Sequence, residues 1–189
     1  MMISYIQGAF PAGSHPWTGR IPNVLELQDL IHAGWRKGIN SGARKETGGV
    51  RGTRKYIGTS EAQTVLRSAG LSVHERYFPR EEGSGTQDAL LAFVEDFYGG
   101  AERGVKVGTR PPMYWQHAGH SMTIVGIERG VDGELSLLVF DPFWAPADRM
   151  RRWAERGRLG SRAEPEKYLP LHRRGRGYLE KYKEFEVMW

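Results

Sequence analysis

Apolar residues recur every three or four positions in residues 21–38, a spacing that gathers them on one face of a helix. That face carries four apolar side chains: Leu27, Leu30, Ile31 and Trp35. Asn23 and Glu26 stand three positions apart at the start of the pattern, the spacing of a capping box in which each side chain binds the other residue's backbone N–H. The pattern therefore predicts a helix capped by Asn23.

Two further segments, residues 60–70 and 88–100, show the same helical periodicity. The first has Ser60 and Gln63 at capping-box spacing and Gly70 at its end. Its predicted apolar stripe consists of Ala62, Val65, Leu66 and Ala69. The second ends in a pair of glycines, which stop a helix. Its predicted inward side chains are Leu90, Phe93, Val94 and Phe97.

Short apolar runs bounded by turn residues dominate the rest of the chain and predict strands. The predicted strands are residues 71–78, 113–117, 121–128, 135–141 and 183–189. The third and fourth of these are joined by a glycine-containing turn and are expected to form an antiparallel hairpin. Because the helices come first and most strands follow, the order indicates an α+β domain, with helices segregated from an antiparallel sheet.

Composition places this chain of 189 residues among single globular domains, since 39% of its residues are hydrophobic and six are Trp. The sequence has no apolar run near the roughly 18 residues that a membrane-spanning helix needs, and its first residues lack the basic region of a signal peptide. It contains no cysteine, which excludes disulfides and thiolate metal sites within the chain. We expect a cytoplasmic or nuclear protein that does not enter membranes.

The net charge of +5 comes largely from one basic segment, Arg149 to Arg176. Such a segment could bind phosphate or another acidic surface, but the simpler interpretation is a solvated helix followed by a loop. Nucleic-acid binding is not expected, because no nucleic-acid-binding motif accompanies the charge. We predict a folded domain over residues 1–146, with residues 147–189 as a basic C-terminal segment that packs on or extends it.

One pair of residues carries the candidate chemistry. His120 begins the first strand of the predicted hairpin and Asp141 ends the second, so an antiparallel pairing brings them to the same end of the sheet. A carboxylate bonded to one imidazole nitrogen fixes the tautomer and leaves the other nitrogen free as a base. Gln116, four residues before His120, could donate its amide to a developing oxyanion. We therefore expect His120 and Asp141 within hydrogen-bond reach.

Simpler interpretations of the same residues exist. A histidine at a strand end is often structural, and we favour that interpretation for His117. Asp141 followed by proline is also a common turn former. A metal site made by His117, His120 and Asp141 is disfavoured, because two histidines three positions apart on a strand point to opposite faces. We therefore expect no metal and no cofactor.

Four separated blocks give the sequence a resemblance to a known family. They are "IPNVLELQDLIHAGW", "GTRKYIGTSEAQTVLRSAGL", "QHAGHSMTIVGIE" and "LLVFDP", in this order. Together they resemble the catalytic domain of the ubiquitin-fold-modifier-specific protease and zinc-finger ubiquitin peptidase family. The resemblance implies a papain-like α+β fold, with thiol-dependent cleavage after the C-terminus of a ubiquitin-like modifier and His120 and Asp141 as catalytic residues.

The family places its nucleophile in a Cys-Gly-Tyr-Arg-Asn stretch at a helix start, where the helix dipole lowers the thiol pKa. The opening "MMISYIQG" resembles the residues that follow that stretch. We therefore expect a chain truncated before its nucleophile, with Met1 pointing toward His120 and no activity as given. The modifier-specific branch has an Asp-Pro-His box, whereas this chain has Phe143 in place of the histidine. His120, 21 residues before Asp141, matches the ubiquitin-peptidase arrangement instead.

Three functional hypotheses follow. The first is a deubiquitinase-type thiol peptidase domain that lacks its cysteine and is inactive as given. The second is a pseudo-peptidase that binds ubiquitin or a ubiquitin-like modifier without cleaving it. The third is a nucleic-acid-associated protein that uses its basic segment, which salt-dependent binding to DNA or RNA would have to support.

Overall fold

The computed structural model describes residues 1–83, 85–99, 110–144, 151–152 and 168–189. These residues form a six-stranded antiparallel sheet with the strand order β1-β6-β2-β3-β4-β5. The strands are β1 Glu75–Phe78, β2 Met113–His117, β3 His120–Arg129, β4 Leu135–Phe140, β5 Arg173–Gly175 and β6 Phe185–Met188. The predicted α+β class is confirmed.

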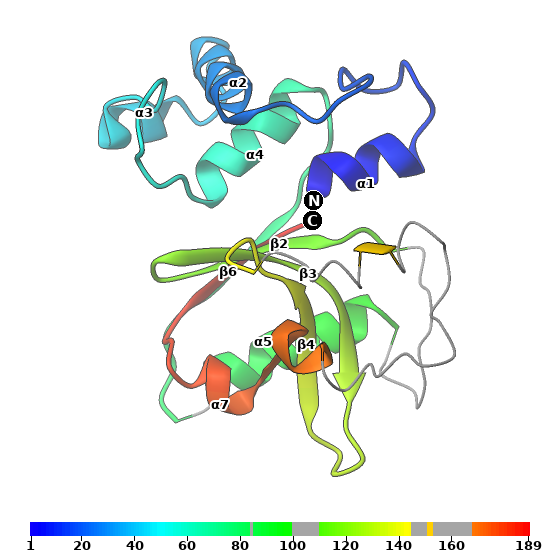
Figure 1. Ribbon diagram of the computed structural model, residues 1–189. Helices are drawn as coiled ribbons and strands as arrows, with labels where there is room; N and C mark the ends of the chain where they lie inside the picture. Colours follow the sequence, from blue (N-terminus) through cyan, green and yellow to red (C-terminus); the bar gives the residue numbers. More distant parts are fainter. Residues whose placement is uncertain (84, 100–109, 145–150, 153–167) are drawn as a thin grey trace.

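Helices cover both faces of this sheet (Figure 1). The described helices are α1 Met2–Ala9, α2 Val24–Arg36, α3 Ser41–Thr47, α4 Thr59–Ser68, α5 Gly85–Phe97 and α7 Arg176–Leu179, with a short 3-10 turn at Leu169–His172. In Figure 1, α1 to α4 lie together on one side of the sheet, and α5 and α7 lie on the other. One hydrophobic core joins α5 to the sheet, and a second joins α1, α2 and α4 to it.

Strand β2 shows how the two cores share one sheet. Its residues alternate between the faces, as strand geometry requires. Met113 and Trp115 are fully buried in the core that contains α5. Tyr114 packs on the core made with α1, α2 and α4. Neighbouring residues of β2 therefore point into different cores, one on each face of the sheet.

The capping box predicted for α2 is confirmed. Asn23 Oδ1 accepts the N–H of Glu26 at 3.0 Å, and the Glu26 carboxylate accepts the N–H of Asn23 at 2.8 Å. The box predicted from Ser60 and Gln63 is wrong. The helix predicted for residues 60–70 is α4, which begins at Thr59. The Glu61 carboxylate reaches back and accepts the N–H of Gly58 at 2.8 Å.

The helix predicted for residues 88–100 is α5, which begins at Gly85, three residues before its predicted start. Its inward residues Leu90, Val94 and Phe97 are buried, and Phe93 is partly buried against the same core. In α4, Val65 and Leu66 are buried, and Ala62 and the capping residue Ala69 are partly buried. The predicted apolar stripes therefore face the two cores.

The last strand of the chain, β6, lies inside the sheet between β1 and β2. Its residues Phe185 and Val187 are buried, in agreement with the predicted closing strand. The C-terminal residues thus complete the sheet that begins with β1. The boundary proposed between residues 146 and 147, and residues 147–150 and 153–167 of the basic C-terminal segment, lie outside the described residues. The two-part division therefore stays a prediction.

No helix within the described ranges has the length and apolar character needed to cross a bilayer.

The core that contains α5 gives a direct stability test. Leu90 is fully buried, so Leu90→Ala should lower the free energy of unfolding by about 2–5 kcal/mol through lost burial and the cavity it leaves. Leu25, which is 58% exposed on α2, is the matched control, and Leu25→Ala should change stability by less than about 0.5 kcal/mol. Urea unfolding followed by circular dichroism measures both. Equal losses in the two variants would contradict the packing described.

Candidate active site

His120 and Asp141 contact each other at one end of the sheet. His120 is the first residue of β3, and Asp141 directly follows β4, the antiparallel neighbour of β3. His120 Nε2 lies 2.7 Å from Asp141 Oδ1. The Asp141 side chain is only 7% exposed and that of His120 is 31% exposed. The predicted contact is confirmed.

The turn before His120 sets its position. Only Ala118 and Gly119 separate β2 from β3, and His117 pairs with His120 across this turn. Gly119 has a φ of 79°, a left-handed conformation that glycine adopts without strain. The tight turn holds the His120 backbone at the rim of the sheet, so the ring reaches Asp141 on one side and remains partly open to solvent.

The hydrogen bond determines which imidazole nitrogen is free. Nε2 donates its hydrogen to the Asp141 carboxylate, so in a neutral ring Nδ1 carries the lone pair. Within the described part of the chain, no hydrogen-bond partner is recorded for His120 Nδ1. A partly exposed imidazole with one nitrogen held by a carboxylate and the other open can accept a proton from a nucleophile.

Asp141 has two further hydrogen-bond donors. Its Oδ1 accepts the N–H of Phe143 at 3.0 Å, and its Oδ2 accepts from Arg174 Nη2 at 2.7 Å. Burial opposes ionisation of this carboxyl, but the bonds from Phe143, His120 and Arg174 outweigh burial and hold the pKa of Asp141 below its ordinary value. Asp141 is therefore a carboxylate at neutral pH and can stabilise an imidazolium at His120.

Sequence reasoning missed Arg174. It lies on β5, in a basic stretch where no spacing distinguishes it from Arg173 or Arg176. The pairing of β5 with β4, in which Arg174 faces Leu137, brings its side chain to Asp141. Only the observation that a carboxylate buried after β4 needs a cation could have pointed to it.

His117 has a different environment from His120. Its ring stacks on Tyr182 with centroids 3.5 Å apart and is 3% exposed. Nδ1 donates to the Ala118 carbonyl oxygen at 3.2 Å, so Nε2 accepts from the Tyr178 hydroxyl at 2.8 Å. Burial lowers the pKa of His117 below its ordinary value and raises that of Tyr178 to about 12. These contacts support the structural role expected for His117.

Gln116 lies on the other face of β2. Its Oε1 accepts from the Tyr114 hydroxyl at 2.8 Å and from the Ser121 hydroxyl at 3.3 Å. A Cβ atom at Gly58, before α4, would lie 3.3 Å from Gln116 Nε2. The amide thus faces the start of α4, whereas the His120 ring lies 5.9 Å from the His117 ring on the opposite face. The structure does not bring Gln116 to the His120–Asp141 pair, and its oxyanion role stays a prediction.

Met1 lies near the beginning of β2. It lines a shallow hollow of about 320 Å³ with Pro112 and Val125, whereas His120 follows the far end of the same strand. A strand of five residues spans roughly 16 Å. No contact between Met1 and His120 is found among the described residues. The expected direction of α1 toward His120 stays a prediction.

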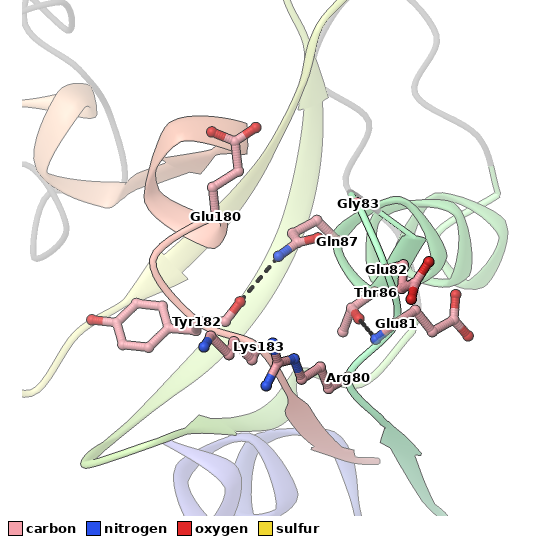
Figure 2. A pocket seen from close by; sticks show the side chains of 9 residues that line it. All are labelled: Arg80, Glu81, Glu82, Gly83, Thr86, Gln87, Glu180, Tyr182 and Lys183. Atoms are coloured by element: carbon pink, nitrogen blue, oxygen red, sulfur yellow. Dashed lines mark hydrogen bonds between the residues drawn. The ribbon is translucent and has the colours of Figure 1, made fainter.

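Two further hollows, of about 550 Å³ and 570 Å³, lie among the described residues, and neither is lined by His120 or Asp141. The hollow of about 550 Å³ lies between the start of α5 and the segment before β6 (Figure 2). It is lined by Arg80, Glu81, Glu82, Gly83, Thr86, Gln87, Glu180, Tyr182 and Lys183. Charges of both signs surround it, and Gln87 donates to the Tyr182 carbonyl oxygen at 3.0 Å. Among the described side chains, no group of three or more His, Asp or Glu residues is placed to hold a metal ion.

Comparisons with known proteins agree in one family. The sequence model of peptidase family C78 matches residues 1–188. Zinc finger-containing ubiquitin peptidase 1 of Rattus norvegicus is 34% identical over 127 residues, which cover 65% of this chain and 22% of that protein. The protein of the same name from Homo sapiens is 32% identical over 127 residues, with the same coverage. The chain thus spans about a fifth of the length of these relatives.

A solved structure, the crystal structure of UfSP from C. elegans, aligns over 92% of this chain and 25% of its own. Its TM-score is 0.44 and the sequence identity is 15%.

The lowered pKa of His117 predicts a pH-dependent stability. The buried ring stays neutral in the folded protein, whereas in the unfolded chain it binds a proton below about pH 6.5. The unfolded state then holds more protons, so stability should fall as the pH falls through that value, by up to about 1.4 kcal/mol per pH unit. Urea unfolding at several pH values from about 8 to 5 measures this slope.

Two variants isolate the effect. His117→Gln removes the titrating ring, so the slope below about pH 6.5 should become shallower even though the protein is less stable overall. His74→Gln changes an exposed histidine and should keep the wild-type slope. An unchanged slope in His117→Gln would show that His117 does not control this stability loss.

Proposed function

The chain belongs to peptidase family C78, and we propose that it forms the ubiquitin-binding and general-base part of a thiol peptidase. The observation that carries the proposal is the 2.7 Å contact between His120 Nε2 and Asp141 Oδ1, in a chain of this family. The α+β fold agrees with the papain-like fold that the family resemblance implied.

The chemistry assigned to the pair is proton transfer. Nδ1 of His120 would accept the proton of a cysteine thiol, and the thiolate would attack the carbonyl carbon at the end of the modifier. The imidazolium would then return the proton to the leaving amine as the C–N bond breaks, which leaves a thioester that water hydrolyses. Asp141 would hold the ring in the required tautomer and stabilise its positive charge.

Ubiquitin is the proposed modifier. The support is the spacing of 21 residues between His120 and Asp141, which matches the ubiquitin-peptidase arrangement, and the presence of Phe143 where the modifier-specific proteases carry a histidine. The relatives at 32–34% identity are named as ubiquitin peptidases.

The second candidate function is a non-catalytic ubiquitin-binding domain. The observation that favours it is the lack of any cysteine among the 189 residues. His120 and Asp141 alone have no thiol to deprotonate, and loss of the nucleophile from a catalytic triad typically costs about 10⁶ in rate. In both candidates, the chain by itself binds ubiquitin and does not cleave it.

Cleavage assays separate the two candidates. The 189-residue chain should not release the fluorophore from a ubiquitin C-terminal amide. The same chain, preceded by a Cys-Gly-Tyr-Arg-Asn segment, should release it, because His120 then has a thiol to deprotonate. Release of fluorescence measures the rate, and replacement of the added cysteine by alanine must abolish it. Cleavage by the unextended chain would contradict the proposal.

Variants of the extended chain test the roles. His120→Ala should lower kcat by about 100-fold or more, the usual contribution of a general base. Asp141→Asn should have a smaller effect than His120→Ala, through the wrong tautomer. The control, His74→Ala, should change kcat by less than about twofold, because His74 is exposed and its ring stacks on Trp189 rather than on the pair. An extended chain that binds ¹⁵N-labelled ubiquitin but stays inert would favour the binding domain.

A further inference from the structure

Arg174 is held more firmly than a surface arginine. Its side chain is 8% exposed, and Nη2 donates to Asp141 Oδ2 at 2.7 Å. Nη1 donates to the carbonyl oxygens of Leu171, at 2.9 Å, and Arg173, at 3.0 Å. The guanidinium also lies over the ring of Tyr178, 4.8 Å from its centroid. Backbone, carboxylate and aromatic contacts together fix the guanidinium plane.

This arrangement fixes the carboxylate as well. Asp141 Oδ2 is occupied by Arg174, and Oδ1 is left for His120 Nε2 and the N–H of Phe143. Rotation of the carboxylate would break the charge-assisted bond to Arg174, which is among the stronger hydrogen bonds in proteins. The orientation of Asp141 toward His120 therefore depends on a residue 33 positions later in the chain.

We propose that Arg174 is a positioning residue of this site, which orients Asp141 toward His120 and limits how strongly that carboxylate attracts a proton to the ring. The proposal rests on the proposed function for its catalytic meaning. A carboxylate already paired with a guanidinium stabilises a neighbouring imidazolium less than an unpaired one does.

Other titratable groups lie on the elements that neighbour the pair. They are His117 on β2, His172 before β5, Tyr178 on α7, and Tyr182, which stacks on His117. His117 is buried and neutral, and the hydroxyl of Tyr178 is protonated at neutral pH. In the described part of the chain, Arg174 is thus the permanently charged group in contact with Asp141.

The experiment is a histidine titration by NMR on the 189-residue chain. Ring ¹⁵N shifts report the tautomer of His120 and the pH at which its ring takes up a proton. Arg174→Met and Arg174→Gln should both raise the midpoint of that titration by about one pH unit or more, because the positive charge beside Asp141 is gone. Arg174→Lys retains the charge and should keep the midpoint while lowering the Tm, since it loses the fork to the two carbonyl oxygens.

Arg173→Met is the matched control. Arg173 precedes Arg174 on β5, and its guanidinium bonds Glu128 at 2.8 Å. Its removal should leave the His120 midpoint unchanged. If Arg174 had only a structural role, every variant would lower the Tm and leave the midpoint of the His120 titration unchanged. An unchanged midpoint in folded Arg174→Met or Arg174→Gln would therefore overturn the proposal. If neither uncharged variant folds, a shifted midpoint in Arg174→Lys would overturn it.

The titration needs no cleavage, so it separates the two proposals. An inert thiol-extended chain with a shifted His120 midpoint would end the catalytic assignment and keep the positioning role. In an extended chain that does cleave, Arg174→Gln should lower kcat and leave KM within about twofold, because Arg174 contacts Asp141 rather than substrate. A rise in KM with kcat unchanged would instead place Arg174 at the substrate surface and refute the positioning role.

Discussion

The carboxylate of Asp141 is the interaction on which the site depends. It is almost fully buried, and it accepts hydrogen bonds from His120 at the start of β3, from the backbone of Phe143 and from Arg174 on β5. A buried charge is tolerated only when its lone pairs are satisfied by donors and its charge is balanced. Two segments far from Asp141 in the sequence must therefore dock correctly before this residue can be buried as an anion.

The sheet topology satisfies that requirement. The β3–β4 hairpin carries His120 and Asp141, and β5 joins its open edge with Arg174 in position to reach the carboxylate. The same C-terminal residues then continue through α7 to β6, which fills the gap between β1 and β2. Completion of the sheet and assembly of the site thus use one segment of chain. Loss of packing in that segment would affect both.

Local chemistry explains which features the sequence predicted. The cap of α2 needs only Asn23 and Glu26, and the β3–β4 hairpin needs only alternation and a turn, so both could be inferred from neighbouring residues. His120 and Asp141 then followed from hairpin geometry. The start of α4 was predicted wrongly because Ser60 and Gln63 have the same three-residue spacing as Gly58 and Glu61. In the structure, the carboxylate of Glu61 accepts the backbone N–H of Gly58, and this bond sets the start of the helix.

Features that depend on long-range pairing could not be predicted in the same way. Arg174 acquires its partner only through the register of β5 on β4, in which it pairs with Leu137. In the sequence it is one of several similar arginines. The pairing of strands, rather than any local motif, selects it.

Stability alone does not account for the Arg174–Asp141 pair. Desolvation of two charges offsets most of their attraction, and well-packed apolar residues of similar volume often stabilise a protein as much or more. The pair is also imperfect, since Arg174 Nε is buried with no partner in the described part of the chain. What an apolar substitute could not supply is a fixed carboxylate oxygen 2.7 Å from His120 Nε2. The cost of burying both charges is therefore best explained by the control they exert on one imidazole ring.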